Sequence, residues 1–93
     1  MTQLLSDEQI AERLRDSVWT RDGGQIVREL KLANFAEAIA LVNRVAEVAE
    51  ARNHHPDILV HDWNQLRLSV TNHAAGGLTD ADFELAKAID ELT

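Results

Sequence analysis

The stretch Glu50-Ala51-Arg52-Asn53-His54-His55-Pro56-Asp57 decides how this chain folds, because it ends the longest predicted helix and turns the backbone. Pro56 cannot continue a helix and favours an extended conformation in the residue before it. If the helix reaches His54, then Glu50 and His54 lie four residues apart on one helix face, within reach of each other. His55 then points in another direction. We therefore expect a corner at which two imidazoles and a carboxylate lie beside a loop.

Upstream of this corner, an apolar stripe predicts one long helix. Asn34 is a good N-cap, and Glu37 is placed to complete a capping box with it. The apolar residues that follow recur at spacings of three and four, which is typical of a helix with one buried face; they are Phe35, Ala38, Ile39, Val42, Val45, Ala46 and Ala49. Leu41 and Val48 lie beside this stripe, where they either widen the core or form a subunit contact. We favour the wider core.

Two β-hairpins are predicted, one on each side of the long helix. Residues 18–21 and 26–32 are rich in β-branched and alternating residues, and Asp22-Gly23-Gly24 between them suits a tight turn. Residues 58–63 and 65–73 predict the second hairpin, with Asn64 at its turn. Leu66, Leu68 and Val70 alternate with polar residues, so one face of this sheet is expected to be buried and the other wet.

Capping boxes predict a helix at each end of the chain. Ser6 and Gln9 start a helix over about residues 7–15, and Thr79 and Asp82 start another over about residues 80–92. Residues 74–77 read as a flexible connector. The expected order is α-β-β-α-β-β-α, an α+β fold in which a four-stranded antiparallel sheet has its helices on one face. Residues 1–93 are expected to form a single domain.

Composition excludes several classes of function. The net charge of −7 argues against nucleic acid as a direct partner, since phosphate binding needs a basic patch. The chain has no cysteine, so disulfides and thiolate chemistry are excluded, which fits a reducing cytosol. The segment Met1–Glu8 lacks the pattern of a signal peptide, and no apolar run approaches the length of a membrane span. We expect a cytoplasmic protein that does not contact membranes.

A third imidazole is predicted near the corner. His73 ends the last predicted strand, and that strand's end comes near His54 and His55 if the two hairpins are neighbours. Such a group, with Glu50, supports three chemistries: a divalent metal site, metal-free acid–base catalysis, or a ligand pocket without turnover. Adjacent histidines rarely bind one ion together, which disfavours the metal. The remaining alternative is that the histidine pair is an accident of the surface.

At this point the sequence resembles a known family. The run from Glu50 to Asp57, then Trp63-Asn64, then Thr71-Asn72-His73, then Gly77-Leu78-Thr79 with Asp82 is similar to the pterin-4a-carbinolamine dehydratases. The likeness covers nearly the whole chain. It implies removal of water from 4a-hydroxytetrahydrobiopterin to give the quinonoid dihydropterin, as in tetrahydrobiopterin recycling. It also implies a reaction without metal or cofactor, in a homodimer or homotetramer.

The resemblance also assigns roles to residues. It implies that His54 and His73 are the acid–base pair, that His55 assists them, and that Glu50 orients His54. It implies that the pterin substrate is contacted by Asp57, Trp63, Thr71 and Asn72. Asp82 is interpreted as the acid of its capping box, and His61 as a surface residue. The alternative is a non-catalytic module on the same scaffold that binds a pterin or a protein partner, as a transcriptional coactivator does.

Overall fold

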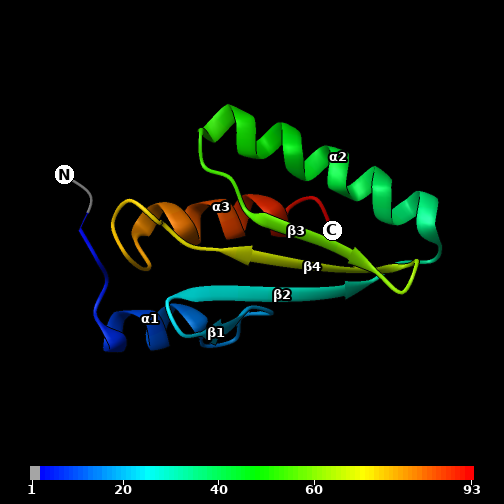
Figure 1. The fold of residues 1–93 in the computed structure, drawn as a ribbon. Coiled ribbons are helices and arrows are strands. Elements are labelled where there is room, and N and C mark those ends of the chain that lie inside the picture. The colour runs from blue at the N-terminus through cyan, green and yellow to red at the C-terminus, as the bar shows by residue number, and fades with distance from the viewer. Residues whose placement is uncertain (1–2) are drawn as a thin grey trace.

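The helices and strands of the computed structural model, which describes residues 3–93, follow the expected order α-β-β-α-β-β-α (Figure 1). The expectation for the N-terminus includes residues 1 and 2, which lie outside that range. The elements are α1 (Asp7–Leu14), β1 (Thr20–Asp22), β2 (Gln25–Lys31), α2 (Phe35–Arg52), β3 (Asp57–His61), β4 (Gln65–Val70) and α3 (Asp80–Asp90). The α+β fold class is confirmed.

The strands form one antiparallel sheet in the order β1-β2-β4-β3. The two hairpins are therefore neighbours, because β2 of the first pairs with β4 of the second. Ile26 lies opposite Val70 in this central pair. The pairing of β3 with β4 begins where Asp57 lies opposite Ser69. This register brings the residues before β3 and the residues after β4 to the same end of the sheet.

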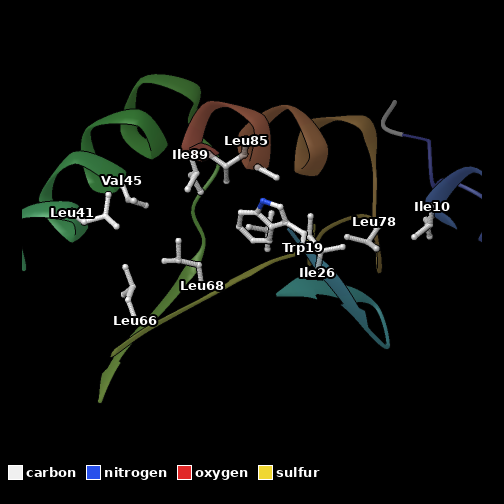
Figure 2. Close-up of a cluster of buried hydrophobic side chains, with 12 residues drawn as sticks. Ile10, Trp19, Ile26, Leu41, Val45, Leu66, Leu68, Leu78, Leu85 and Ile89 are labelled. Atoms are coloured by element: carbon white, nitrogen blue, oxygen red, sulfur yellow. The ribbon is translucent and has the colours of Figure 1, made fainter. Parts of the chain in front are cut away.

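Helices α2 and α3 lie side by side over one face of the sheet, and α1 lies near the β1 edge (Figure 1). Alternation along β4 turns Leu66, Leu68 and Val70 toward the helices, and each is 0% exposed. Figure 2 shows how side chains from all three helices meet the sheet in one cluster. Complete burial of one such side chain stabilises the fold by about 1.5–3 kcal/mol.

The buried face of α2 differs from the predicted stripe. The buried residues are Ala38, Leu41, Val45 and Ala49. Phe35, by contrast, is 54% exposed, and Ala46 is also exposed. The prediction was wrong at these two positions because the spacing of apolar residues does not distinguish the core face of a helix from an apolar flank beside it. The wider core is confirmed, since Leu41 is buried and Val48 packs against the cluster.

The caps at the helix starts are mostly as predicted. Ser6 with Gln9 and Thr79 with Asp82 form complete capping boxes. At α2, the Asn34 side chain accepts a hydrogen bond from the Glu37 backbone N–H, which is one half of the predicted box. Within residues 3–93, none of the helices is long and apolar enough to cross a membrane.

The strand ends were predicted less well than the helix starts. In the first hairpin, Asp22 pairs with Gln25 across a two-residue turn in which Gly23 has a φ of +61°. The prediction that the last strand reaches His73 was wrong, because β4 ends at Val70. Residues 71–77 instead form a turn in which Asn72 pairs with Gly77.

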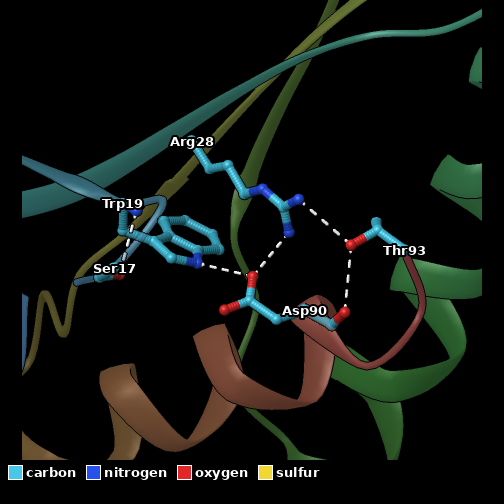
Figure 3. A network of polar contacts seen from close by, with 5 residues as sticks. All are labelled: Ser17, Trp19, Arg28, Asp90 and Thr93. Carbon is cyan, nitrogen blue, oxygen red and sulfur yellow. Dashed lines mark hydrogen bonds and ion pairs between the residues drawn. The ribbon is translucent and has the colours of Figure 1, made fainter.

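A polar network ties the end of α3 to the sheet (Figure 3). One carboxylate oxygen of Asp90 accepts from the Trp19 indole N–H at 2.9 Å and from Arg28 at 2.6 Å. Arg28 also donates to the Thr93 hydroxyl at 3.2 Å. The Arg28 side chain is only 14% exposed, and a charged group at such a depth needs a partner. Asp90 therefore satisfies two donors at once.

Candidate active site

The corner after α2 is set by the way the helix ends. The last helical residue is Arg52, and Asn53 follows in the left-handed conformation with a φ of +50°. The helix therefore stops before His54, whose backbone N–H donates back to the carbonyl of Ala49. Because His54 lies outside the helix, the predicted pairing of Glu50 with His54 at a four-residue helical spacing is wrong.

His54 contacts a buried carboxylate instead. Its Nε2 lies 2.5 Å from Oδ1 of Asp82, which is 0% exposed, and the His54 side chain is 17% exposed. A carboxylate only accepts hydrogen bonds, so Nε2 of His54 carries the hydrogen and donates it. This fixes the tautomer of a neutral His54 and leaves Nδ1 as the nitrogen able to take a proton. The Asp82 carboxylate therefore holds one nitrogen of His54 in place.

The other oxygen of Asp82 is held by the start of α3. Oδ2 accepts from the backbone N–H of Thr79 at 2.7 Å and from the Thr79 hydroxyl at 3.1 Å. The Asp82 carboxylate thus completes the capping box and orients His54 at the same time. Three donors satisfy this fully buried charge, which would otherwise be costly to remove from water. The interpretation of Asp82 as a capping residue was correct but incomplete.

Glu50 pairs with the second histidine. Nε2 of His55 lies 3.2 Å from Oε1 of Glu50, and both side chains are exposed, at 53% and 79%. The same hydrogen-bond argument assigns the hydrogen to Nε2 of His55. The two adjacent imidazoles therefore contact different carboxylates. Among residues 3–93, no three or more acidic or histidine side chains are arranged to hold a metal ion together.

His73 lies in the turn that follows β4. The turn is closed by hydrogen bonds from the Gly76 backbone N–H to Asn72 and from the Ala75 N–H to the Asn72 side chain. His73 is exposed and lines a hollow of about 340 Å³, which we call the His73 hollow. The residues around this hollow are Asp22, Gly24, Gln25, Thr71, Asn72, His73, Gly76 and Gly77.

The topology brings the three histidines to one end of the sheet. Figure 1 shows the α2–β3 loop, the β4–α3 loop and the start of α3 at that end. His54 and His55 precede the pair of Asp57 with Ser69, and His73 follows that pair, in the turn beyond the end of β4. Of the three, His73 alone lines the His73 hollow. The sheet therefore gathers the imidazoles at one end, with His54 turned toward α3 and His73 toward the first hairpin.

The remaining predicted contact residues lie in three different places. Thr71 and Asn72 line the His73 hollow. Asp57 lines a different hollow, of about 280 Å³, together with Leu59 and Arg67. Trp63 is 61% exposed at the β3–β4 turn, which is the opposite end of β3 from the histidines. Within this chain, Trp63 therefore does not join the imidazoles.

Sequence reasoning did not foresee the contact of Asp82 with His54, and it missed Asp22 and Gln25 at this end of the sheet. Asp82 lies three, four and seven residues before the buried Leu85, Ala86 and Ile89, which places it on the same face of α3. This spacing could have predicted that its carboxylate is buried. Asp22 and Gln25 gave no comparable sign. They reach the His73 hollow only because the first hairpin pairs with β4, a contact between distant parts of the chain.

Comparison with known proteins gives consistent matches. The family model described as pterin 4 alpha carbinolamine dehydratase matches residues 3–92. A relative from Nocardia farcinica is 52% identical over 92 residues, covering 98% of this chain and 96% of its own length. A relative from Roseiflexus sp. is 50% identical over 93 residues, covering 99% of both chains. Both relatives carry the provisional name pterin-4-alpha-carbinolamine dehydratase.

Two solved structures share the fold. One, described as a transcriptional coactivator/pterin dehydratase from Brucella melitensis, has a TM-score of 0.88 at 24% identity and covers 96% of this chain and 97% of its own. The other, described as a pterin dehydratase-like protein that is a RuBisCO assembly factor in the alpha-carboxysome, has a TM-score of 0.63 at 16% identity. It covers 80% of this chain and 84% of its own. At these identities the likeness concerns the fold alone.

Proposed function

Because this chain belongs to the pterin 4 alpha carbinolamine dehydratase family, we propose that it removes water from a 4a-hydroxytetrahydropterin by histidine acid–base catalysis. The product is the quinonoid dihydropterin. The proposal rests above all on the contact between His54 and the buried Asp82 carboxylate, at 2.5 Å. An imidazole held in this way has a defined tautomer and a defined orientation, which proton transfer requires.

The reaction needs two proton movements. The C4a–O bond breaks as a proton reaches the hydroxyl oxygen, which leaves as water. The N5–H proton is removed, and its electron pair forms the C4a=N5 double bond. One imidazolium and one neutral imidazole can supply both steps near neutral pH, since histidine is readily present in either form there. Loss of water in these two steps consumes no oxidant and needs no metal or cofactor to balance its atoms and electrons.

His54 transfers a proton through Nδ1, because Nε2 is engaged by Asp82. His73 is the second proton-transfer group, since it lines a hollow large enough for a small ligand, within the range of about 300–1,000 Å³. His55, with Glu50, assists at the rim. Thr71 and Asn72 contact the substrate. The specific choice of tetrahydrobiopterin, the homo-oligomeric state and the cytoplasmic location stay predictions.

The test is a kinetic assay on freshly generated 4a-hydroxytetrahydropterin. The purified protein is expected to exceed the dehydration rate in buffer. Alanine at His54 or at His73 should lower kcat by roughly 10²- to 10⁴-fold, the usual contribution of a general acid or base. His61→Ala is the matched control, because His61 lies at the other end of β3. A wild-type rate equal to that in buffer would refute the proposal.

A second function on the same scaffold is a protein-interaction module. Exposed apolar side chains favour it, since Ile58 and Leu59 of β3 are 37% and 53% exposed, and β3 lies at the edge of the sheet. An unpaired sheet edge with such side chains is a ready surface for another chain. Pterin binding without any turnover, together with stable capture of a protein partner, would favour this module over the dehydratase.

A further inference from the structure

The His73 hollow has two walls from distant parts of the chain. The first hairpin supplies Asp22, Gly24 and Gln25, and the turn after β4 supplies the rest. The walls are joined where the Thr71 hydroxyl donates to the Gly24 carbonyl at 2.6 Å. A Cβ added at Gly24 would lie 4.0 Å from the Cα of Gly77, so the backbones approach closely there. The first hairpin therefore forms part of the His73 hollow, and none of its residues has a role in the proposed proton transfers.

Asp22 is the one carboxylate among the residues that line this hollow, and one of its oxygens already contacts other side chains. Its Oδ2 lies 3.3 Å from Nε2 of Gln25 and 3.5 Å from a guanidinium nitrogen of Arg67. Within residues 3–93, Oδ1 receives no hydrogen bond from the protein. The Asp22 side chain is 63% exposed, and these two long contacts to Oδ2 leave Oδ1 available. Each carboxylate oxygen has two lone pairs, so Oδ2 also retains accepting capacity.

We infer that Asp22 is a specificity-determining residue, which binds the aminopyrimidine edge of the pterin in the His73 hollow. This inference rests on the proposed function. A pterin presents two parallel donors on one edge, the ring N3–H and the 2-amino group. A carboxylate accepts such a pair side by side, and hydrogen bonds to an ionised acceptor are about twice as strong as neutral ones.

The other polar groups of the hollow match the same orientation. Asn72 uses its carbonyl oxygen for the Ala75 N–H, so its amide nitrogen is available to donate to the pterin 4-oxo group. Gln25 donates its amide hydrogen to Asp22, so its carbonyl oxygen remains an acceptor. With the aminopyrimidine edge on Asp22, the reacting C4a and N5 lie on the far side of the ring. In this orientation we place that side toward His73, which lines the same hollow.

Two other acidic residues near this end are less suitable. Glu50 is not part of the lining of the His73 hollow, and its carboxylate contacts His55. Asp57 lines a separate hollow that contains none of the histidines. Asp22 is therefore the carboxylate that shares its hollow with a proposed proton-transfer group.

The test compares two ligands on three proteins: wild type, Asp22→Asn and Asp16→Asn. Pterin has the 2-amino group, whereas lumazine has a 2-oxo group in its place and therefore lacks one donor. Wild type should bind pterin more tightly than lumazine by on the order of 10-fold, the lower end of a hydrogen bond to a charged group. Asp22→Asn should lose or invert this preference, since an amide can donate to the 2-oxo group and accept from N3–H. Asp16→Asn makes the same charge change at an exposed residue outside the hollow and should behave as wild type.

Measurements of KM and kcat for Asp22→Asn test the role of Asp22 separately from the dehydratase activity. If the chain is a dehydratase, Asp22→Asn should raise KM for the 4a-hydroxytetrahydropterin about 10-fold and leave kcat within a few-fold, as expected for uniform binding. Unchanged KM and unchanged ligand preference in an active Asp22→Asn enzyme would overturn the inference alone. Ligand preference that depends on Asp22 in a protein without turnover would overturn the dehydratase alone. Asp22→Ser repeats the measurement if the asparagine variant folds poorly.

Discussion

Nε2 of His54 donates to Oδ1 of Asp82 across 2.5 Å, although 28 residues separate them in the chain. The same carboxylate caps α3 through Thr79. A single buried acid therefore links the start of a helix to the orientation of an imidazole. Changes at Asp82 should affect both folding stability and proton transfer, and the two effects can be measured separately.

Asp82→Asn should lower kcat by roughly 10²-fold, because an amide nitrogen facing His54 no longer accepts from Nε2 and the tautomer is lost. The free energy of unfolding should fall by about 1.5–3 kcal/mol, the usual value for hydrogen bonds to a charged group. Thr79→Val is the comparison variant. It removes one hydroxyl donor to Asp82 but leaves the His54 contact, so it should also cost about 1.5–3 kcal/mol in stability, with a much smaller loss of kcat. Equal losses of kcat in both variants would contradict a positioning role.

Glu50→Gln should change kcat by less than about fivefold, since an exposed ion pair contributes about 0–1 kcal/mol. The pair of Glu50 with His55 is 3.2 Å long and open to solvent. The measurement is kcat of Glu50→Gln, determined by steady-state kinetics alongside that of Asp82→Asn. A loss as large as that of Asp82→Asn would mean that Glu50 acts on the substrate directly.

Asp90→Ala should destabilise the fold by about 1.5–3 kcal/mol, because Arg28 and the Trp19 indole lose their common acceptor. Urea unfolding followed by tryptophan fluorescence measures this loss. A Trp63→Phe background isolates the signal of the buried Trp19, since Trp63 is 61% exposed. Glu91→Ala is the control at an adjacent exposed residue. Equal unfolding midpoints for the two variants would show that the network adds no stability.

Leu41→Ala should cost about 2–5 kcal/mol, as expected when a fully buried leucine leaves a cavity. Phe35→Ala should change stability by only about 0.5 kcal/mol, in line with surface positions. Leu41 is 2% exposed and Phe35 is 54% exposed. Denaturation of both variants checks which face of α2 is buried. A larger effect at Phe35 would indicate that the α2 face bearing it is covered in solution by another chain.

Local patterns in the sequence determined most of the secondary structure. Capping boxes located the starts of α1 and α3, because these bonds form between residues three apart. The pair Gly23-Gly24 located the first turn, and Pro56 located the corner after α2. Alternation along β4 identified Leu66, Leu68 and Val70 as the buried face. Each of these signals depends on near neighbours in the chain.

The tertiary structure decided what the polar residues contact. Sequence spacing favoured a Glu50–His54 pair, yet the left-handed Asn53 ends the helix early and turns His54 toward Asp82. Asp22 lines the same hollow as His73 only because β2 pairs with β4. A hydrogen bond between distant residues depends on the packing of whole elements, and spacing along the chain does not carry that information. The sequence therefore supplied the histidines and the fold class, and packing selected their partners.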